Sequence, residues 1–150
     1  SQLASIGEKV EGVISGSIMS GDVDSEAFRS LDKKFSALRG RAPSLFVENY
    51  YRGAKFAILA LQAVHGNIED QKAYREALLK VSFDAPASKV SLDAYHNVVT
   101  DTFLNQVKLI NGEWRNSVIK TYPMVSQFWT FDPEEYQAEP PYDSTHPDCP

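Results

Sequence analysis

The sequence predicts an α/β fold in which one lobe is incomplete. A short strand is followed by three helices, then by a β-meander and a proline-rich tail. The helix over about 45–64 is apolar over most of its circumference, which is typical of a helix packed on several sides. The predicted strands are too few to cover this helix and its two neighbours. We therefore expect further strands, from a portion of the same protein that lies N-terminal to this chain.

The first elements are a strand and an amphipathic helix. Val13-Ile14 indicates a short buried strand that runs into the loop Ser15–Met19. Either Asp24 or Ser25 can cap the helix that follows, because a short side-chain oxygen accepts a hydrogen bond from a free backbone N–H. Apolar residues then recur at three- and four-residue spacing, which places them on one face of the helix: Phe28, Leu31, Phe35 and Leu38.

Two more helices follow. Gly40 ends the first helix, and Ala42-Pro43-Ser44 precedes the apolar helix over 45–64. One apolar stripe of that helix consists of Tyr51, Ala54, Ile58, Leu61 and either Val64 or His65, and it is widened by Phe56, Ala57 and Ala60. A helix over about 69–80 comes next, and its spacing predicts that it buries Tyr74, Leu78 and Val81.

The hydrophobic period changes from helical to alternating after Pro86. Val90 and Leu92 alternate with polar residues, and apolar residues follow at spacing two over 103–109. Asn111-Gly112 predicts a two-residue hairpin, because both residues tolerate the positive φ angles that such a turn needs. The return strand is expected over 114–121.

The composition changes again from residue 122. Six of the eight prolines lie between Pro123 and Pro150, and proline cannot donate to a strand ladder. Five aromatic residues are interleaved with them: Phe128, Trp129, Phe131, Tyr136 and Tyr142. We therefore divide the chain into a lobe segment, 1–121, and an extended tail, 122–150, that wraps over the body.

Composition and charge exclude several classes of protein. The chain has 150 residues, of which 43% are hydrophobic, too many for a disordered protein. Its formal charge is −5, and its basic residues are sparse, so nucleic acid is not an expected partner. Neither a membrane-spanning apolar run nor a signal peptide is apparent in this sequence.

The order of elements and several short motifs resemble the last portion of type I periplasmic solute-binding proteins, which serve ABC importers. This group includes receptors for branched-chain amino acids, amides and aromatic acids. The matching segments cover nearly the whole chain: Glu11–Ile14, Gly40–Ser44, Glu48–Ala54, Tyr74–Leu78, Ser82–Pro86, Val90–Asp93, Tyr122–Trp129 and Asp132–Tyr136. Arg52-Gly53 departs from the family, since Asp-Ala is the commonest pair at that place.

The resemblance implies a two-lobed fold with three-layer lobes, in which a small organic solute binds in the cleft between the lobes. The strand at 11–14 would cross between the lobes. The expected ligand-binding residues are Ser17, Ile18 and Met19 at the strand exit, and Val47, Glu48 and Tyr51 at a helix start. The implied partners are the solute, the missing N-terminal portion and an ABC permease, and the implied location is periplasmic or extracellular. Neither a cofactor nor catalysis is expected.

Other interpretations of these residues remain open. Glu48 has two possible roles. It either accepts a hydrogen bond from an ammonium group of the ligand, or it only stabilises the helix through its favourable interaction with the helix dipole. Asp143, His146, Asp148 and Cys149 are metal-ligand types, but their spacing matches no common zinc site. Cys149 is either a free thiol or a disulfide partner of a cysteine in the missing portion. A cytoplasmic sensor on the same fold and a small hydrolase are the alternative functions.

Overall fold

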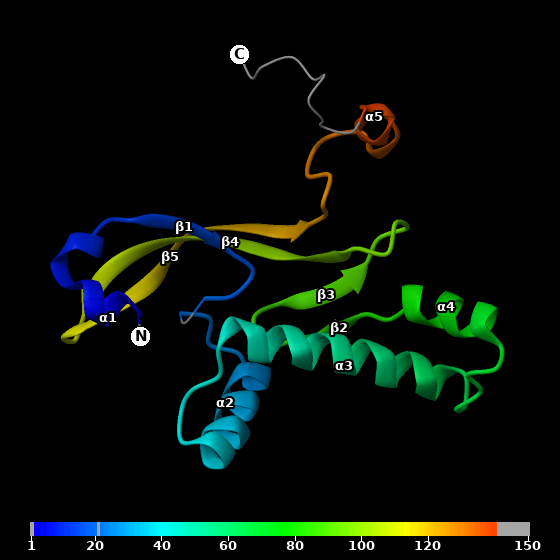
Figure 1. The fold of residues 1–150 in the computed structure, drawn as a ribbon, viewed down its shortest axis with the longest axis horizontal. Helices are drawn as coiled ribbons and strands as arrows, with labels where there is room; N and C mark the ends of the chain where they lie inside the picture. Colours follow the sequence, from blue (N-terminus) through cyan, green and yellow to red (C-terminus); the bar gives the residue numbers. More distant parts are fainter. Residues whose placement is uncertain (1, 21, 141–150) are drawn as a thin grey trace.

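The computed structural model describes residues 2–20 and 22–140 (Figure 1). The helices are α1 (Gln2–Ile6), the 3-10 helix η1 (Gly7–Val10), α2 (Glu26–Arg39), α3 (Leu45–Ala63), α4 (Gln71–Leu79) and α5 (Pro133–Ala138). The strands are β1 (Ile14–Ser17), β2 (Phe83–Asp84), β3 (Lys89–Leu92), β4 (Val98–Ile110) and β5 (Glu113–Val125). The predicted α/β fold class with a C-terminal meander is confirmed.

The sheet is antiparallel and is built around the long strand β4. Asn105 of β4 pairs with Ser15 on one side and Val118 on the other, while Thr100 pairs with Val90 and Val125. Strands β1 and β3 therefore share one edge of β4, at different places along it, and β5 follows the opposite edge. Figure 1 shows α3 and α4 beside the β2–β3 end of this sheet, with β1 at the other end.

The hairpin between β4 and β5 has the predicted turn, but its second strand is longer than predicted. Asn111 and Gly112 both have positive φ, 51° and 81°, as the predicted two-residue turn requires. However, β5 continues to Val125, past the predicted start of the tail at residue 122. A β-bulge makes this possible, because Pro123 lies between the paired residues Tyr122 and Val125, where no ladder N–H is needed.

The main core lies between α3, α4 and the β2–β3 hairpin. Its buried members are Phe56, Ala60, Val81, Ala85 and Val90. The half-buried Tyr74 and Leu78 pack against this cluster, as predicted for the helix over 69–80. Ser25 is the residue that caps α2, since its Oγ accepts a hydrogen bond from the backbone N of Phe28 at 2.9 Å.

One burial prediction is wrong. Val13 and Ile14 are 50% and 59% exposed, because the β1 end of the sheet lies clear of α3 and α4, and β1 itself begins only at Ile14. The apolar stripe of α3 is largely uncovered, with Ile58 54% exposed, as expected for a helix that the strands of this chain are too few to cover. The stripe of α3 that faces the sheet consists of Glu48, Arg52, Phe56 and Ala60, of which the two apolar residues belong to the predicted apolar surface.

The tail contacts the body through Phe128, which is buried. Its ring lies 5.0 Å from the ring of Tyr95, in the turn between β3 and β4. Trp129, Phe131 and Tyr136 remain more than half exposed. Wrapping of the whole tail over the body stays a prediction, since residues 141–150 lie outside the described residues.

Candidate functional site

The strand exit after β1 and the start of α3 meet at one point, through Arg52. The Nη2 of Arg52 donates a hydrogen bond to the carbonyl oxygen of Ile18 at 3.3 Å. Its Nε donates to Oε1 of Glu48 at 2.9 Å, and its Nη2 also donates to that oxygen. The two segments predicted to face the ligand are therefore held together by a single guanidinium group.

A third segment joins this point from the β2–β3 hairpin. The backbone N of Ala87 donates to the same Oε1 of Glu48 at 3.2 Å. The side chains of Glu48 and Arg52 are 0% and 4% exposed, so this ion pair is buried. A buried ion pair needs several hydrogen bonds to offset the loss of hydration, and here three segments supply them.

The ion pair leaves two polar atoms without partners among the described residues. These are Oε2 of Glu48 and Nη1 of Arg52, and both are buried. Arg52 also lines a cavity of about 210 Å³, which we name the Arg52 cavity. Its other lining residues come from the β1 exit, from α3 and from the start of β4: Ile18, Asn49, Gly53, Phe56 and Val98.

The remaining predicted residues lie around this point but do not join it by any hydrogen bond that the structure shows. Ser17 Oγ accepts a bond from the backbone N of Met19 at 3.1 Å, so the hydroxyl shapes its own loop. Val47 is half-buried in the first turn of α3. Tyr51 is also half-buried, and its hydroxyl accepts a bond from Lys55 Nζ at 3.4 Å. Their roles toward a ligand stay predictions.

Sequence reasoning noticed Arg52 only as a departure from the family, and so omitted it from the site. The signal that could have found it is its spacing of four residues after Glu48, which places a carboxylate and a guanidinium side by side on a helix. Ala87 and Val98 carried no comparable signal. Their proximity to Arg52 depends on how the β2–β3 hairpin and β4 fold back onto α3.

Metal binding is not indicated in the part of the chain that the structure describes. Among residues 2–20 and 22–140, no group of three or more His, Cys, Asp or Glu side chains could hold a metal ion. The candidate residues Asp143, His146, Asp148 and Cys149 lie outside the described residues. Within the same described part, no helix has the length and apolarity that crossing a membrane requires.

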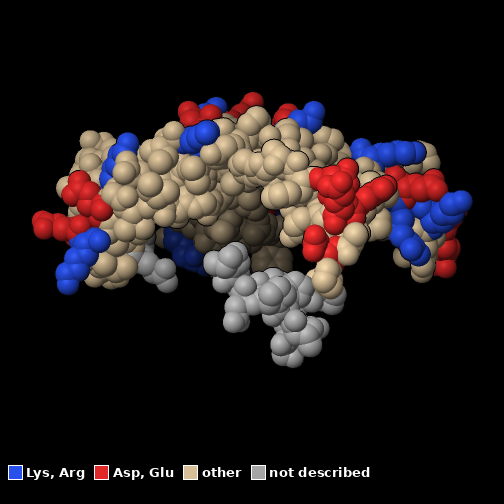
Figure 2. All heavy atoms as spheres, turned by 90° about the horizontal axis from the view of Figure 1, so that it is seen from above, with Lys and Arg blue, Asp and Glu red and all other residues tan. Residues whose placement is uncertain are grey.

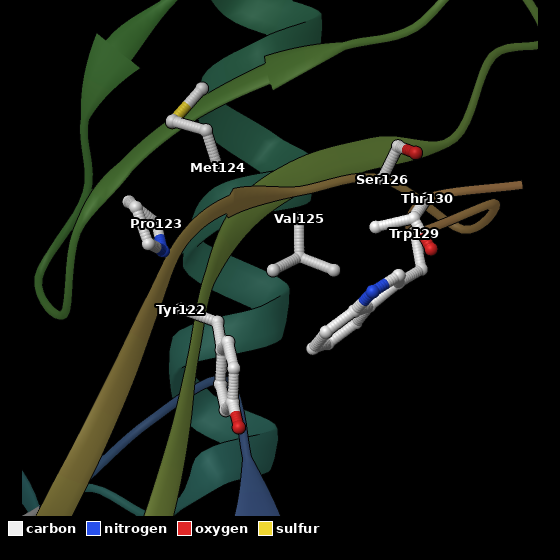
Figure 3. A pocket seen from close by; sticks show the side chains of 7 residues that line it. All are labelled: Tyr122, Pro123, Met124, Val125, Ser126, Trp129 and Thr130. Atoms are coloured by element: carbon white, nitrogen blue, oxygen red, sulfur yellow. The ribbon is translucent and has the colours of Figure 1, made fainter.

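A second hollow, of about 240 Å³, lies at the end of β5 (Figure 3). The rings of Tyr122 and Trp129 flank it with their centroids 4.9 Å apart, already in contact with each other. All of its lining residues belong to the single segment 122–130. It is therefore a local surface hollow, whereas the Arg52 cavity gathers residues from three separate elements.

Charged side chains of both signs lie at the ends and along the upper edge of the face in Figure 2, and a group of acidic side chains lies to the right of its centre. Among the coloured residues of this face, lysines and arginines do not gather into the continuous basic area that binds nucleic acid.

The structure is similar to those of ABC transporter substrate-binding proteins. One from Sphaerobacter thermophilus is 27% identical, with a TM-score of 0.74, and the match covers 81% of this chain and 33% of that one. A solute-binding protein from R. palustris, solved with benzoate, is 23% identical, with a TM-score of 0.71, and the match covers 84% of this chain and 34% of that one. The chain has part of a type I periplasmic binding protein fold.

A binding protein for leucine, isoleucine, valine, threonine and alanine from Brucella ovis has the same fold. It is 18% identical, with a TM-score of 0.68, and the match covers 87% of this chain and 35% of that one. No family model matches the chain, and no curated protein matches its sequence. The predicted resemblance to periplasmic binding proteins is confirmed, and the chain spans about a third of the length of the proteins that it matches.

Proposed function

We propose that this chain belongs to the solute-binding component of an ABC importer, which captures a small organic solute between two lobes without transforming it. The observation that carries this proposal is the link through Arg52 between Ile18 and Glu48. This link joins the strand exit and the helix start on one side of the proposed cleft. Open α/β folds commonly present ligands at such strand exits.

The similar proteins support the solute class. One of them was solved in complex with benzoate, and another is named as a binding protein for leucine, isoleucine, valine, threonine and alanine. We propose a branched-chain amino acid, an amide or an aromatic carboxylate as the solute of this protein. Its contacts on this chain are Ser17, Ile18 and Met19 on one segment, and Val47, Glu48 and Tyr51 on the other.

The partners follow from the same proposal. The remaining part of the protein supplies the other side of the cleft, and an ABC permease receives the solute. The working location is then periplasmic or extracellular. A signal peptide encoded upstream of this chain would support that location, whereas a cytoplasmic sensor would have none.

The decisive experiment uses the full-length protein. After purification from its host, it is denatured, and any released small molecule is identified by mass spectrometry. Isothermal titration calorimetry with that molecule then measures its affinity, and product analysis after long incubation checks for turnover. We expect a single small organic solute that is recovered unchanged. Conversion of the bound molecule, or no binding to any solute of the three classes, contradicts the proposal.

A further inference from the structure

The segment that follows β1 runs from one side of β4 to the other. Ser17, at the end of β1, pairs with Phe103 of β4. Shortly after it, the Oγ of Ser20 donates a hydrogen bond to the carbonyl oxygen of Asn116 in β5 at 3.3 Å. Strands β1 and β5 lie on opposite sides of β4 (Figure 1). Two strand spacings amount to about 10 Å, which the residues from Ser17 to Ser20 span when extended. The strand exit therefore crosses one face of β4.

The bond from Ser20 reaches the outer edge of β5. Val107 of β4 pairs with Asn116, but its own N–H and C=O are bonded on the other side, to the residues that precede β1. Paired residues that do not bond each other turn their peptide groups away from each other, so the carbonyl of Asn116 points away from β4. Asp22 bonds β5 nearby, since its Oδ2 accepts a hydrogen bond from the backbone N of Val118 at 3.1 Å.

Ser20 and Asp22 together form what we name the β5 strap. Ser20 is 3% exposed, and its Oγ also accepts a bond from the backbone N of Asp22 at 3.4 Å. The two residues connect to β5 at positions 96 residues away in the sequence. The strap thus ties the far end of the strand exit to a strand that β1 itself does not touch.

The strand exit is consequently held at three places. Ser17 is held by its pairing with β4, the carbonyl of Ile18 by Arg52, and Ser20 by β5. A loop that is already fixed in its binding conformation loses less conformational entropy when a ligand binds, so the ligand binds more tightly.

We propose that Ser20 and Asp22 are positioning residues for solute binding, because their bonds to β5 hold Ser17, Ile18 and Met19 in the conformation that receives the solute. Neither residue of the strap touches the solute in this proposal. The inference rests on the proposed function and adds to it the device that orders one side of the cleft.

The first test is calorimetry of the full-length protein with benzoate and with leucine. In Asp22→Ala the bond to Val118 is lost, and we expect the affinity for the probe that binds to fall about 3- to 10-fold. Asp22→Asn should restore the affinity to within about twofold of the unchanged protein, because an amide oxygen still accepts a bond from the N–H of Val118. If Asp22→Asn loses as much affinity as Asp22→Ala, the bond is not the cause and the proposal is overturned.

Asp101 provides the matched control. Its Oδ1 accepts a hydrogen bond from the backbone N of Met124 at 3.0 Å, so it makes the same kind of contact with β5 but away from the strand exit. Asp101→Ala should lower the stability in urea unfolding about as much as Asp22→Ala does, and leave the affinity unchanged. Equal affinities in Asp22→Ala and Asp101→Ala show a purely structural strap and overturn the proposal.

The second test needs no solute. Amide hydrogen exchange of residues 17–19 in the unliganded full-length protein reports how firmly the strand exit is held. We expect faster exchange of these amides in Asp22→Ala than in Asp101→Ala. If the two variants exchange alike, the strap does not hold the strand exit, and the proposal falls while the importer function stands. If the unchanged protein binds neither probe and releases no solute on denaturation, the proposed function falls and the positioning role falls with it.

Discussion

The two faces of α3 differ most in its N-terminal turns, where the usual distribution of polar and apolar residues is inverted. The face toward the sheet buries Glu48 and Arg52 almost completely. The opposite face exposes Phe46 by 73% and Tyr50 by 81%. In the first turns of α3 the charged pair is therefore inside and these two aromatic rings are outside, whereas Phe56 and Ala60 make the inner face apolar further along.

This difference shows what each face is for. A buried ion pair contributes little net stability compared with apolar side chains of similar size, so its presence indicates a specific geometric or binding role. An exposed aromatic face, in contrast, indicates a surface that another part of the protein covers. We therefore propose that the buried pair on the inner face of α3 serves the site, and that the outer face contacts the rest of a protein of which this chain spans about a third.

The largest expected effect concerns the outer face. Residues 1–150 produced alone should self-associate or melt without cooperativity, because covering a few hundred Å² of apolar surface is worth about 25 cal/mol per Å². The free energy gained by burying a few hundred Å² is therefore comparable to the whole free energy of unfolding of a small domain. Light scattering and a circular dichroism melt of the isolated chain, beside the full-length protein, measure the effect. A cooperative melt of a monomeric isolated chain contradicts it.

Removal of one member of the buried pair should have the next largest effect. Arg52→Met leaves Glu48 buried without a counter-charge, and we expect a loss of about 3–5 kcal/mol in the unfolding free energy of the full-length protein. Adding Glu48→Met should recover most of it, because the pair is then replaced by apolar side chains. Urea unfolding measures both variants.

The exposed pair of Lys72 and Glu76 provides the control for that comparison. Their side chains are 88% and 58% exposed, so Lys72→Met should change the unfolding free energy by less than about 1 kcal/mol. If Arg52→Met and Lys72→Met lower the unfolding free energy equally, burial of the Glu48–Arg52 pair does not explain the effect at Arg52.

Two neighbouring tyrosines on α3 separate binding from packing. Tyr51→Ala should weaken solute binding by about 1–3 kcal/mol, as for a buried aromatic contact. Tyr50 lies on the outer face, so Tyr50→Ala should lower the stability of the full-length protein and leave the affinity unchanged. Calorimetry and thermal melts of both variants decide the matter. If Tyr51→Ala lowers only stability, Tyr51 belongs to the core.

The smallest expected effect is at the strand exit. Ser17→Ala removes a hydroxyl that accepts a bond from Met19, and we expect the affinity to fall by about 1 kcal/mol. The reason is either a lost ligand contact or a less ordered loop. Unchanged affinity in Ser17→Ala, measured by calorimetry, removes Ser17 from the site.

Local patterns predicted much of the fold correctly. The Asn111-Gly112 turn, the helix spacing that buries Tyr74 and Leu78, and the cap at Ser25 are confirmed because each depends on residues close together in the sequence. Ile18 and Glu48 were also placed on neighbouring segments correctly. The end of β5 was missed, because a bulge that accommodates Pro123 depends on its pairing with Thr100 and Thr102.

The sequence by itself thus determined the order of α2, α3, α4 and the β4–β5 hairpin and the apolar excess of α3, since periodicity and turn chemistry act over a few residues. It did not predict α1 and η1, nor the helix α5 within the expected extended tail. Only the tertiary structure decided which face of α3 turns inward. The β2–β3 hairpin brings the N–H of Ala87 to Glu48, and the β1 exit brings the carbonyl of Ile18 to Arg52. Hydrogen-bond partners 39 and 34 residues away make burial of this ion pair possible, and no local pattern in the sequence encodes such distant partners.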